Sequence, residues 1–260
     1  MHHPIAVFDA GIGSYAIVAE IHKQLPDQDI LYFADRASFP YGNKGQDELL
    51  EVMQRTLRFL ESYAPSAIVV ASNAPSIMVL DSIRKYSATP LFGVYPPVNE
   101  ALTISRSGKV GIMGVRSLIE SAPLQRFVTQ HASRPHDVAL INASPMVELV
   151  EDGTFLFEVE KTQEAVHAFI DNILHQYPDI DTLTLSSTHL PWLRSFFEAA
   201  CPSCRFLDSA ESVIAGLGSG VRGTGRIQGL VTESEAHDVE TLRRMLKQFG
   251  VEIPLEVVEL

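Results

Sequence analysis

The sequence predicts an α/β protein of two pseudo-symmetric domains, each built on a mostly parallel sheet flanked by helices, with a ligand cleft between them. Two observations predict this class. Short β-rich runs alternate with segments of helical periodicity along the whole chain, which is typical of parallel sheets covered by helices on both faces. A strand-and-turn motif of the first half also recurs in the second half, which indicates two related α/β units.

Nine β-rich runs are the candidate strands. They span residues 5–9, 30–34, 67–72, 91–95, 109–114, 137–141, 181–187, 204–208 and 227–232. Between them, apolar side chains recur three or four residues apart, as in Leu49, Met53, Leu57 and Leu60, and this spacing predicts helices with one buried face. After the last of these strands we expect a helix and a β-rich tail.

The internal repeat centres on two predicted strand ends. Residues 67–75 read AIVVASNAP and residues 182–191 read TLTLSSTHLP, each a strand followed by Ser, a polar residue and then a Pro near a helix start. Ser72 and Ser187 match at an offset of 187 − 72 = 115 residues. Ligands of open α/β sheets bind beyond the carboxyl ends of strands, so we expect the two serines to face each other across the cleft.

The domain boundaries follow from this repeat. We expect the first domain to comprise residues 1–98 and 209–260, and the second to comprise residues 99–208. The stretch 216–225 holds five glycines and is predicted to be a flexible surface connection. It lacks the Lys-Ser/Thr ending that a phosphate-binding loop needs.

Composition excludes two classes of partner. The chain has 20 Lys+Arg against 32 Asp+Glu, a formal net charge of −12. Nucleic acid and anionic membrane surfaces are polyanions that require basic patches, so neither is an expected partner. The apolar runs are too short to span a membrane and no signal-peptide pattern is seen, so we expect a soluble, cytoplasmic protein.

Two cysteines, Cys201 and Cys204, lie in a Cys-Pro-Ser-Cys stretch. A thioredoxin-like redox pair would start a helix after an early strand, whereas this pair follows a helix-like segment and precedes a strand. A zinc site would need further Cys or His ligands nearby. We interpret both as ordinary residues and predict no metal site.

A second glycine-rich turn resembles a nucleotide-binding signature. Residues 11–16 read GIGSYA, which fits G-x-G-x-x-A, and Asp35 ends the next predicted strand. However, the carboxylate of Asp9 stands immediately before the turn, where it would repel a pyrophosphate. A tight glycine turn is the simpler interpretation. Nucleotide-dependent catalysis is therefore kept only as a third functional hypothesis, behind an enzyme without a nucleotide and a non-catalytic binding protein.

Five ordered motifs then point to one family. They are FDAGIG at 8–13, YFAD with PYG at 32–35 and 40–42, VASNA at 70–74, STHLP at 187–191 and DSAE at 208–211. In order and spacing they resemble the glutamate racemases of the aspartate/glutamate racemase superfamily, and the resemblance covers essentially the whole chain. It implies two α/β domains, a substrate cleft between them, no cofactor and commonly a homodimer.

The resemblance also implies a reaction and its catalytic positions. In that family two cysteines face opposite sides of the α-carbon of an acidic amino acid, and one removes a proton while the other returns one. Motif matching places those cysteines at Ser72 and Ser187 of this chain. A serine hydroxyl is far less acidic than a thiol and needs a strong neighbouring base. We therefore expect ordinary glutamate racemisation to be lost.

Other matched positions complete the candidate site. The resemblance assigns helper acid–base roles to Asp9, Glu151 and His189, and substrate contacts to Ala10, Pro40, Tyr41, Gly42, Asn73, Ala74 and Thr188. Taken singly, Asp9 and His189 could be helix-cap residues and Glu151 a solvated loop carboxylate.

Three matched positions have lost a hydrogen-bonding group. Ala10, Ala74 and Leu118 are apolar where the family has polar residues. Each lost contact to a charged group is worth about 1.5–3 kcal/mol. The expected ligand is therefore another small acidic or carbonyl-containing metabolite.

Two hypotheses lead. The first is a cofactor-independent racemase-superfamily enzyme of altered chemistry. The alternative is a catalytically silent paralogue, or pseudoenzyme, that binds a metabolite or a partner protein.

Overall fold

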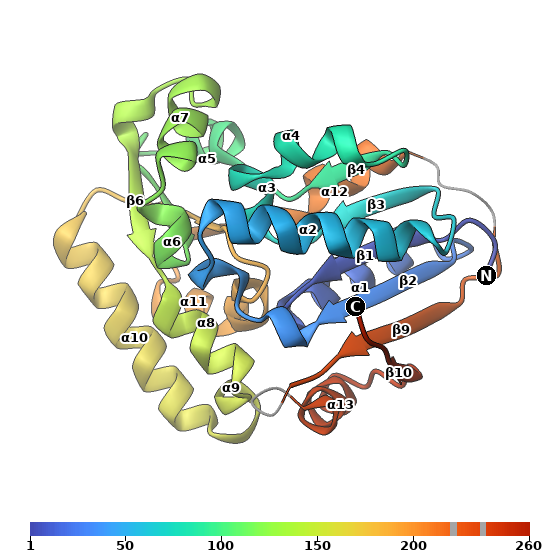
Figure 1. The fold of residues 1–260 in the computed structure, drawn as a ribbon. Helices are drawn as coiled ribbons and strands as arrows, with labels where there is room; N and C mark the ends of the chain where they lie inside the picture. The colour runs from blue at the N-terminus through green and yellow to red at the C-terminus, as the bar shows by residue number, and fades with distance from the viewer. Residues whose placement is uncertain (219–222, 235–237) are drawn as a thin grey trace. The chain divides into compact units, whose positions relative to one another are not determined.

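The computed structural model describes residues 1–218, 223–234 and 238–260 (Figure 1). The chain forms two compact units, unit 1 with residues 1–94 and 210–260, and unit 2 with residues 95–209. Residues 219–222, inside the glycine-rich stretch predicted to be a flexible connection, lie outside the described residues. No helix among the described residues has the length and apolar character needed to cross a membrane.

Unit 1 contains a parallel six-stranded sheet. Its strands are β1 (Ile5–Asp9), β2 (Ile30–Asp35), β3 (Ala67–Val70), β4 (Leu91–Gly93), β9 (Ile227–Thr232) and β10 (Leu255–Val257). They pair in the order β10-β9-β2-β1-β3-β4. Every residue of β1, β2 and β3 is buried, as expected of central parallel strands covered on both faces.

Helices cover both faces of this sheet. They are α1 (Tyr15–Gln24), α2 (Gln46–Glu61), α3 (Asn73–Met78), α4 (Leu80–Ile83), α12 (Ala210–Leu217) and α13 (Val239–Gln248), with short 3-10 turns η1 (Ile12–Ser14), η2 (Arg36–Ser38), η3 (Tyr41–Asn43) and η4 (Arg84–Tyr86). Figure 1 shows α2 lying across one face of the sheet and α1 on the other. The predicted apolar stripe of α2 is confirmed, because Leu49, Met53, Leu57 and Leu60 are all fully buried.

Unit 2 contains a parallel four-stranded sheet. Its strands are β5 (Val110–Gly114), β6 (Val138–Asn142), β7 (Thr182–Leu185) and β8 (Arg205–Asp208), paired in the order β6-β5-β7-β8. Its helices are α5 (Val98–Ile104), α6 (Arg116–Ile119), α7 (Ala122–His131), α8 (Ser144–Glu151), α9 (Thr154–Phe157), α10 (Val159–Gln176) and α11 (Arg194–Ala200), with η5 (Pro135–Asp137) and η6 (Leu190–Leu193).

The two units repeat one topology, which confirms the fold class. The order β2-β1-β3-β4 of unit 1 recurs as β6-β5-β7-β8 in unit 2. The same backbone bond closes the central pair in each unit. Ala71 N–H donates to the Phe8 carbonyl at 2.8 Å, and Ser186 N–H donates to the Met113 carbonyl at 2.9 Å. The next residue in both units is the serine that the sequence repeat singled out.

All nine predicted strands are present, with edges that agree or differ by one or two residues. Two of the two-residue differences are at the repeated strand ends, where 67–72 becomes Ala67–Val70 and 181–187 becomes Thr182–Leu185. The physical reason is common to both. The chain makes one further bond to the neighbouring strand and then turns into a helix, so the serine lies beyond the sheet.

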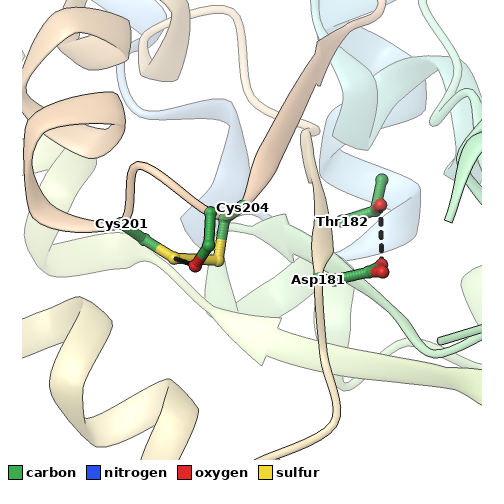
Figure 2. Close-up of a disulfide and its surroundings, with 5 residues drawn as sticks. Asp181, Thr182, Cys201 and Cys204 are labelled. Carbon is green, nitrogen blue, oxygen red and sulfur yellow. Dashed lines mark hydrogen bonds between the residues drawn. A yellow bond between two sulfur atoms is a disulfide. The ribbon is translucent and has the colours of Figure 1, made fainter. Parts of the chain in front are cut away.

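The interpretation of the two cysteines as ordinary residues is wrong. Cys201 and Cys204 form a disulfide with a Cα–Cα distance of 5.3 Å (Figure 2). The turn between α11 and β8, closed by the bond from Cys204 N–H to the Cys201 carbonyl at 3.1 Å, brings the two residues within disulfide range. Nothing in the spacing alone distinguishes this pairing from two free thiols.

Candidate active site

The carboxyl end of the unit 1 sheet gathers five of the predicted site residues. Asp9 ends β1 and Ala10 follows it, while Ser72, Asn73 and Ala74 follow the neighbouring strand β3. Asp9, Ala10, Asn73 and Ala74 are buried and Ser72 is half-buried. Because β1 and β3 are parallel neighbours, these residues lie together; we call them the unit 1 strand end.

Hydrogen bonds to Val94 fix the turn that carries Ser72. The Asn73 side-chain amide donates to the Val94 carbonyl at 3.2 Å. The Ser76 hydroxyl donates to the Ser72 carbonyl at 2.7 Å and accepts from Val94 N–H at 2.9 Å. The Ser72 hydroxyl makes no capping bond to α3. The backbone at Ser72 is therefore held while its hydroxyl is not used to cap the helix.

Tyr41 is a hydrogen-bond donor held beside two carboxylates. Its hydroxyl donates to Asp35 Oδ2 at 3.1 Å, and Thr232 Oγ1 donates to Asp35 Oδ1 at 3.0 Å. Burial first, and then the negative charges of Asp35 and Asp9, raise the pKa of Tyr41 well above its usual range. The phenol therefore stays protonated. Pro40 and Gly42, which flank it, are half-buried.

The hydrogen bonds that Asp35 accepts also bear on the nucleotide-binding hypothesis for the glycine turn at residues 11–16. The turn folds as η1, where the Ser14 hydroxyl donates to the Gly11 carbonyl at 3.1 Å. Both oxygens of Asp35 accept hydrogen bonds from within unit 1. This carboxylate, which the nucleotide hypothesis would place on a ribose, has a structural role in the chain.

The carboxyl end of the unit 2 sheet brings three predicted residues into direct contact. His189 Nε2 lies 2.8 Å from Glu151 Oε2, and Ser187 Oγ lies 3.4 Å from His189 Nδ1. Only 7% of the His189 side chain and 10% of the Glu151 side chain are exposed. We call Ser187, His189 and Glu151 the unit 2 triad.

The triad has a defined polarity. A carboxylate only accepts hydrogen bonds, so the proton shared with Glu151 belongs to Nε2 of His189. In the neutral imidazole Nδ1 is then a lone pair, and the Ser187 hydroxyl donates to it. His189 can accept a proton at Nδ1 while the Glu151 carboxylate stabilises the resulting imidazolium.

Local structure explains why Ser187 and His189 meet. Leu190 N–H donates to the Ser187 carbonyl at 3.0 Å, and Trp192 N–H donates to the His189 carbonyl at 3.2 Å, so the chain turns tightly from β7 into η6. Thr188, between the two, is buried. Glu151 is the last residue of α8, which packs against η6.

Sequence reasoning named the members of the triad but not their chain of hydrogen bonds. In unit 1 it named Asp35 only within a motif and not as the partner of Tyr41, and it missed the supporting residues Thr232 and Ser76. The available signal was the Ser-x-His spacing after β7, which has no counterpart after β3. Among the described residues, no group of three or more His, Cys, Asp or Glu side chains is placed to hold a metal ion.

Comparison with known proteins places the chain in a family. No family model matches it. The glutamate racemase of Sulfurihydrogenibium sp. is 31% identical over 250 residues, which is 94% of this chain and 93% of the relative. The chain belongs to the glutamate racemase family.

Solved structures of this family share the fold. The glutamate racemase of Thermus thermophilus, in complex with β-chloro-D-alanine, is 28% identical and superposes with a TM-score of 0.80 over 99% of this chain and 97% of that chain. The glutamate racemase of Francisella tularensis, in complex with D-glutamate, gives a TM-score of 0.81 at 21% identity over 99% and 97% of the two chains. The two-unit parallel α/β architecture is thus that of the racemase family.

Proposed function

We propose that this family member is a cofactor-independent enzyme that moves a proton at the carbon beside a carboxyl or carbonyl group, and that its substrate is a small acid or carbonyl compound other than glutamate. The observation that carries the proposal is the contact of His189 with both Glu151 and Ser187. A buried imidazole oriented by a carboxylate is a general acid–base group.

In our proposal serine takes the place of both family cysteines in this chain. Motif matching puts Ser72 and Ser187 at the positions of the two bases. A thiol has a pKa near 8.5 and ionises readily near neutral pH, whereas a hydroxyl does not. In our proposal the serines are hydrogen-bond donors, and the proton is carried by His189, with Asp9 as the corresponding group of the unit 1 strand end.

Apolar substitutions support a change of ligand. The Francisella relative binds D-glutamate, a small acidic ligand, and we propose a small ligand of related type here. Ala10, Ala74 and Leu118 are buried, with 1%, 5% and 0% of their surfaces exposed. Three apolar side chains in place of hydrogen-bonding ones favour a ligand with fewer charged groups than an amino acid.

The proposal includes assembly and location. It keeps the homodimeric state that the sequence resemblance implies and the cytoplasmic location expected from the sequence. Light scattering on the purified chain tests the dimer, because a monomer at micromolar concentration would contradict it.

Proton NMR in D2O tests the chemistry. L- and D-glutamate, L- and D-aspartate and a panel of small 2-substituted acids would be incubated with the native chain and with His189→Asn. We expect exchange of the α-proton in a panel acid, lost in the variant, and none above a no-protein blank in glutamate. Rapid glutamate racemisation by the native chain would overturn the argument from serine chemistry.

One observation favours the alternative of a non-catalytic binding protein. Ala74 occupies the unit 1 position that corresponds to His189, so only one strand end carries an imidazole. A silent paralogue would bind a panel acid, seen as a raised melting temperature, without exchanging its proton. Any exchange that disappears in His189→Asn excludes it.

A further inference from the structure

We propose that Ser187 is an acyl-accepting nucleophile, and that the chain hydrolyses activated esters and thioesters of small carboxylic acids through an acyl-Ser187 intermediate. This activity goes beyond the proposed proton transfer, because it uses the hydroxyl of Ser187 itself and requires no acidic C–H bond in the substrate.

The triad supplies the three groups that nucleophilic catalysis by serine needs. They are a hydroxyl, a base in contact with it and a carboxylate that orients the base. Ser187 Oγ is 3.4 Å from His189 Nδ1, and His189 Nε2 is 2.8 Å from Glu151 Oε2. The contact of 3.4 Å is at the long end of the hydrogen-bond range, and catalytic hydrogen bonds of this kind often shorten when substrate binds.

The position of Ser187 suits attack on a carbonyl. It lies beyond the carboxyl end of β7, a central strand flanked by β5 and β8, at the turn into η6. This is the edge at which parallel sheets bind ligands. Ser187 is 8% exposed, and burial strengthens its electrostatic interaction with His189. Because so little of Ser187 is exposed, we limit the proposal to short acyl groups.

The reaction balances with water as the only co-reactant. Ser187 Oγ bonds to the carbonyl carbon of the ester while its proton moves to His189 Nδ1. The bond from that carbon to the leaving oxygen or sulfur breaks, and His189 returns the proton to the leaving group. Water then attacks the acyl-serine, gives a proton through His189 to Ser187 Oγ, and releases the free acid.

Unit 1 provides an internal comparison. Ser72 stands at the same place in the repeated topology, but the position matching His189 is Ala74. The amide of Asn73, the residue between them, is bonded to the Val94 carbonyl. No imidazole is therefore supplied to Ser72 by its own turn, and the proposal predicts that acylation distinguishes the two serines.

Acetylation by p-nitrophenyl acetate tests the proposal. The native chain would be mixed with this ester, release of p-nitrophenolate followed, and the acetylated residue located by peptide mass spectrometry. We expect acetyl on Ser187, none on Ser72, and a rate about 10²–10⁴-fold lower in His189→Gln. Ser187→Ala should abolish the initial rapid release of p-nitrophenolate. Ser195→Ala, at an exposed position on α11, should leave that release unchanged.

Other outcomes have defined meanings. Acetyl found on lysines but not on Ser187, or on Ser187 at an unchanged rate in His189→Gln, would overturn the proposal. Melting temperatures of all variants separate loss of folding from loss of chemistry. Proton exchange measured on the same samples keeps the two proposals distinct, because exchange without acetylation removes only the acyl-transfer activity.

Discussion

The two strand ends share a backbone but differ in chemistry. After β3 the chain reads Ser72-Asn73-Ala74, and after β7 it reads Ser187-Thr188-His189. In both units the residue before the serine donates the same backbone hydrogen bond to the neighbouring strand. The shared topology therefore places the two serines at equivalent positions. The neighbouring residues then decide how the hydroxyl is used. Among the described residues, an imidazole that is itself bonded to a carboxylate contacts Ser187, and no such contact is seen for Ser72.

Introducing a thiol at both strand ends should have the largest effect on this comparison. In Ser72→Cys/Ser187→Cys each strand end carries a group that ionises near neutral pH. We expect glutamate racemisation, followed by circular dichroism, to rise about 100-fold above the native chain, roughly the effect of one general acid–base group. Each single cysteine variant is the control and should gain little, since the reaction that the resemblance implies needs two bases.

Removing the charge behind His189 should have a smaller effect. Glu151→Gln keeps the size of the side chain but no longer stabilises the imidazolium. We expect the rates of proton exchange and of acetylation to fall by about 10–100-fold, within the usual range for acid–base groups. Asp152→Asn, on the neighbouring residue, is the matched control. Equal rates in Glu151→Gln and the native chain would show that the contact at 2.8 Å is only structural.

The amino ends of the sheets offer a second comparison between the units. Asp29, just before β2, accepts hydrogen bonds from His2 N–H, Thr224 and Arg226 N–H. Asp181, just before β7, accepts from Ser105, Thr182 and the N–H groups of 106 and 107. Burial opposes ionisation of both, but these hydrogen bonds prevail and lower both pKa values.

This arrangement predicts acid sensitivity in both units, larger in unit 1. A depressed pKa means that the carboxylate stabilises the fold above its unfolded value near 3.9, and that this contribution is lost as the pH falls below it. Asp29 is 1% exposed and Asp181 is half-buried. We expect Asp29→Asn to lower the free energy of unfolding by about 2 kcal/mol and Asp181→Asn by about 1 kcal/mol.

Urea unfolding at pH 7 and pH 3.5 checks this prediction. The difference in free energy of unfolding between the native sequence and each variant should shrink at the lower pH. At pH 3.5 the aspartate of the native sequence is partly protonated in the unfolded state, whereas it is still ionised in the folded state. Asp47→Asn, at an exposed position in the first turn of α2, is the control. A difference that grows on acidification would contradict the assigned direction of the pKa shifts.

Local features of the fold could be predicted from the sequence, and long-range contacts could not. The strands follow from runs of β-branched and apolar residues, and the stripe of α2 follows from its spacing. The bond between Glu151 and His189 joins residues 38 positions apart, and the bond between Asp35 and Thr232 joins residues 197 positions apart. Such contacts depend on how whole elements pack, which periodicity does not report.

The site shows the same division. Motifs located Ser72, Ser187 and His189, because their order along the chain is a local property. Pairing of Cys201 with Cys204 was missed because a four-residue stretch is compatible with a disulfide and with free thiols alike. The geometry of the turn between α11 and β8 decides between them.

The most direct test of the account compares the two strand ends in one experiment. Loss of the α-proton signal of a panel acid in D2O would be followed with the native chain, His189→Asn and Ser72→Ala. The account predicts exchange by the native chain, a fall to the no-protein rate in His189→Asn, and a rate within about tenfold of native in Ser72→Ala, the loss of one hydrogen bond. Exchange that survives in His189→Asn but is abolished in Ser72→Ala would place the chemistry at the unit 1 strand end and contradict the account.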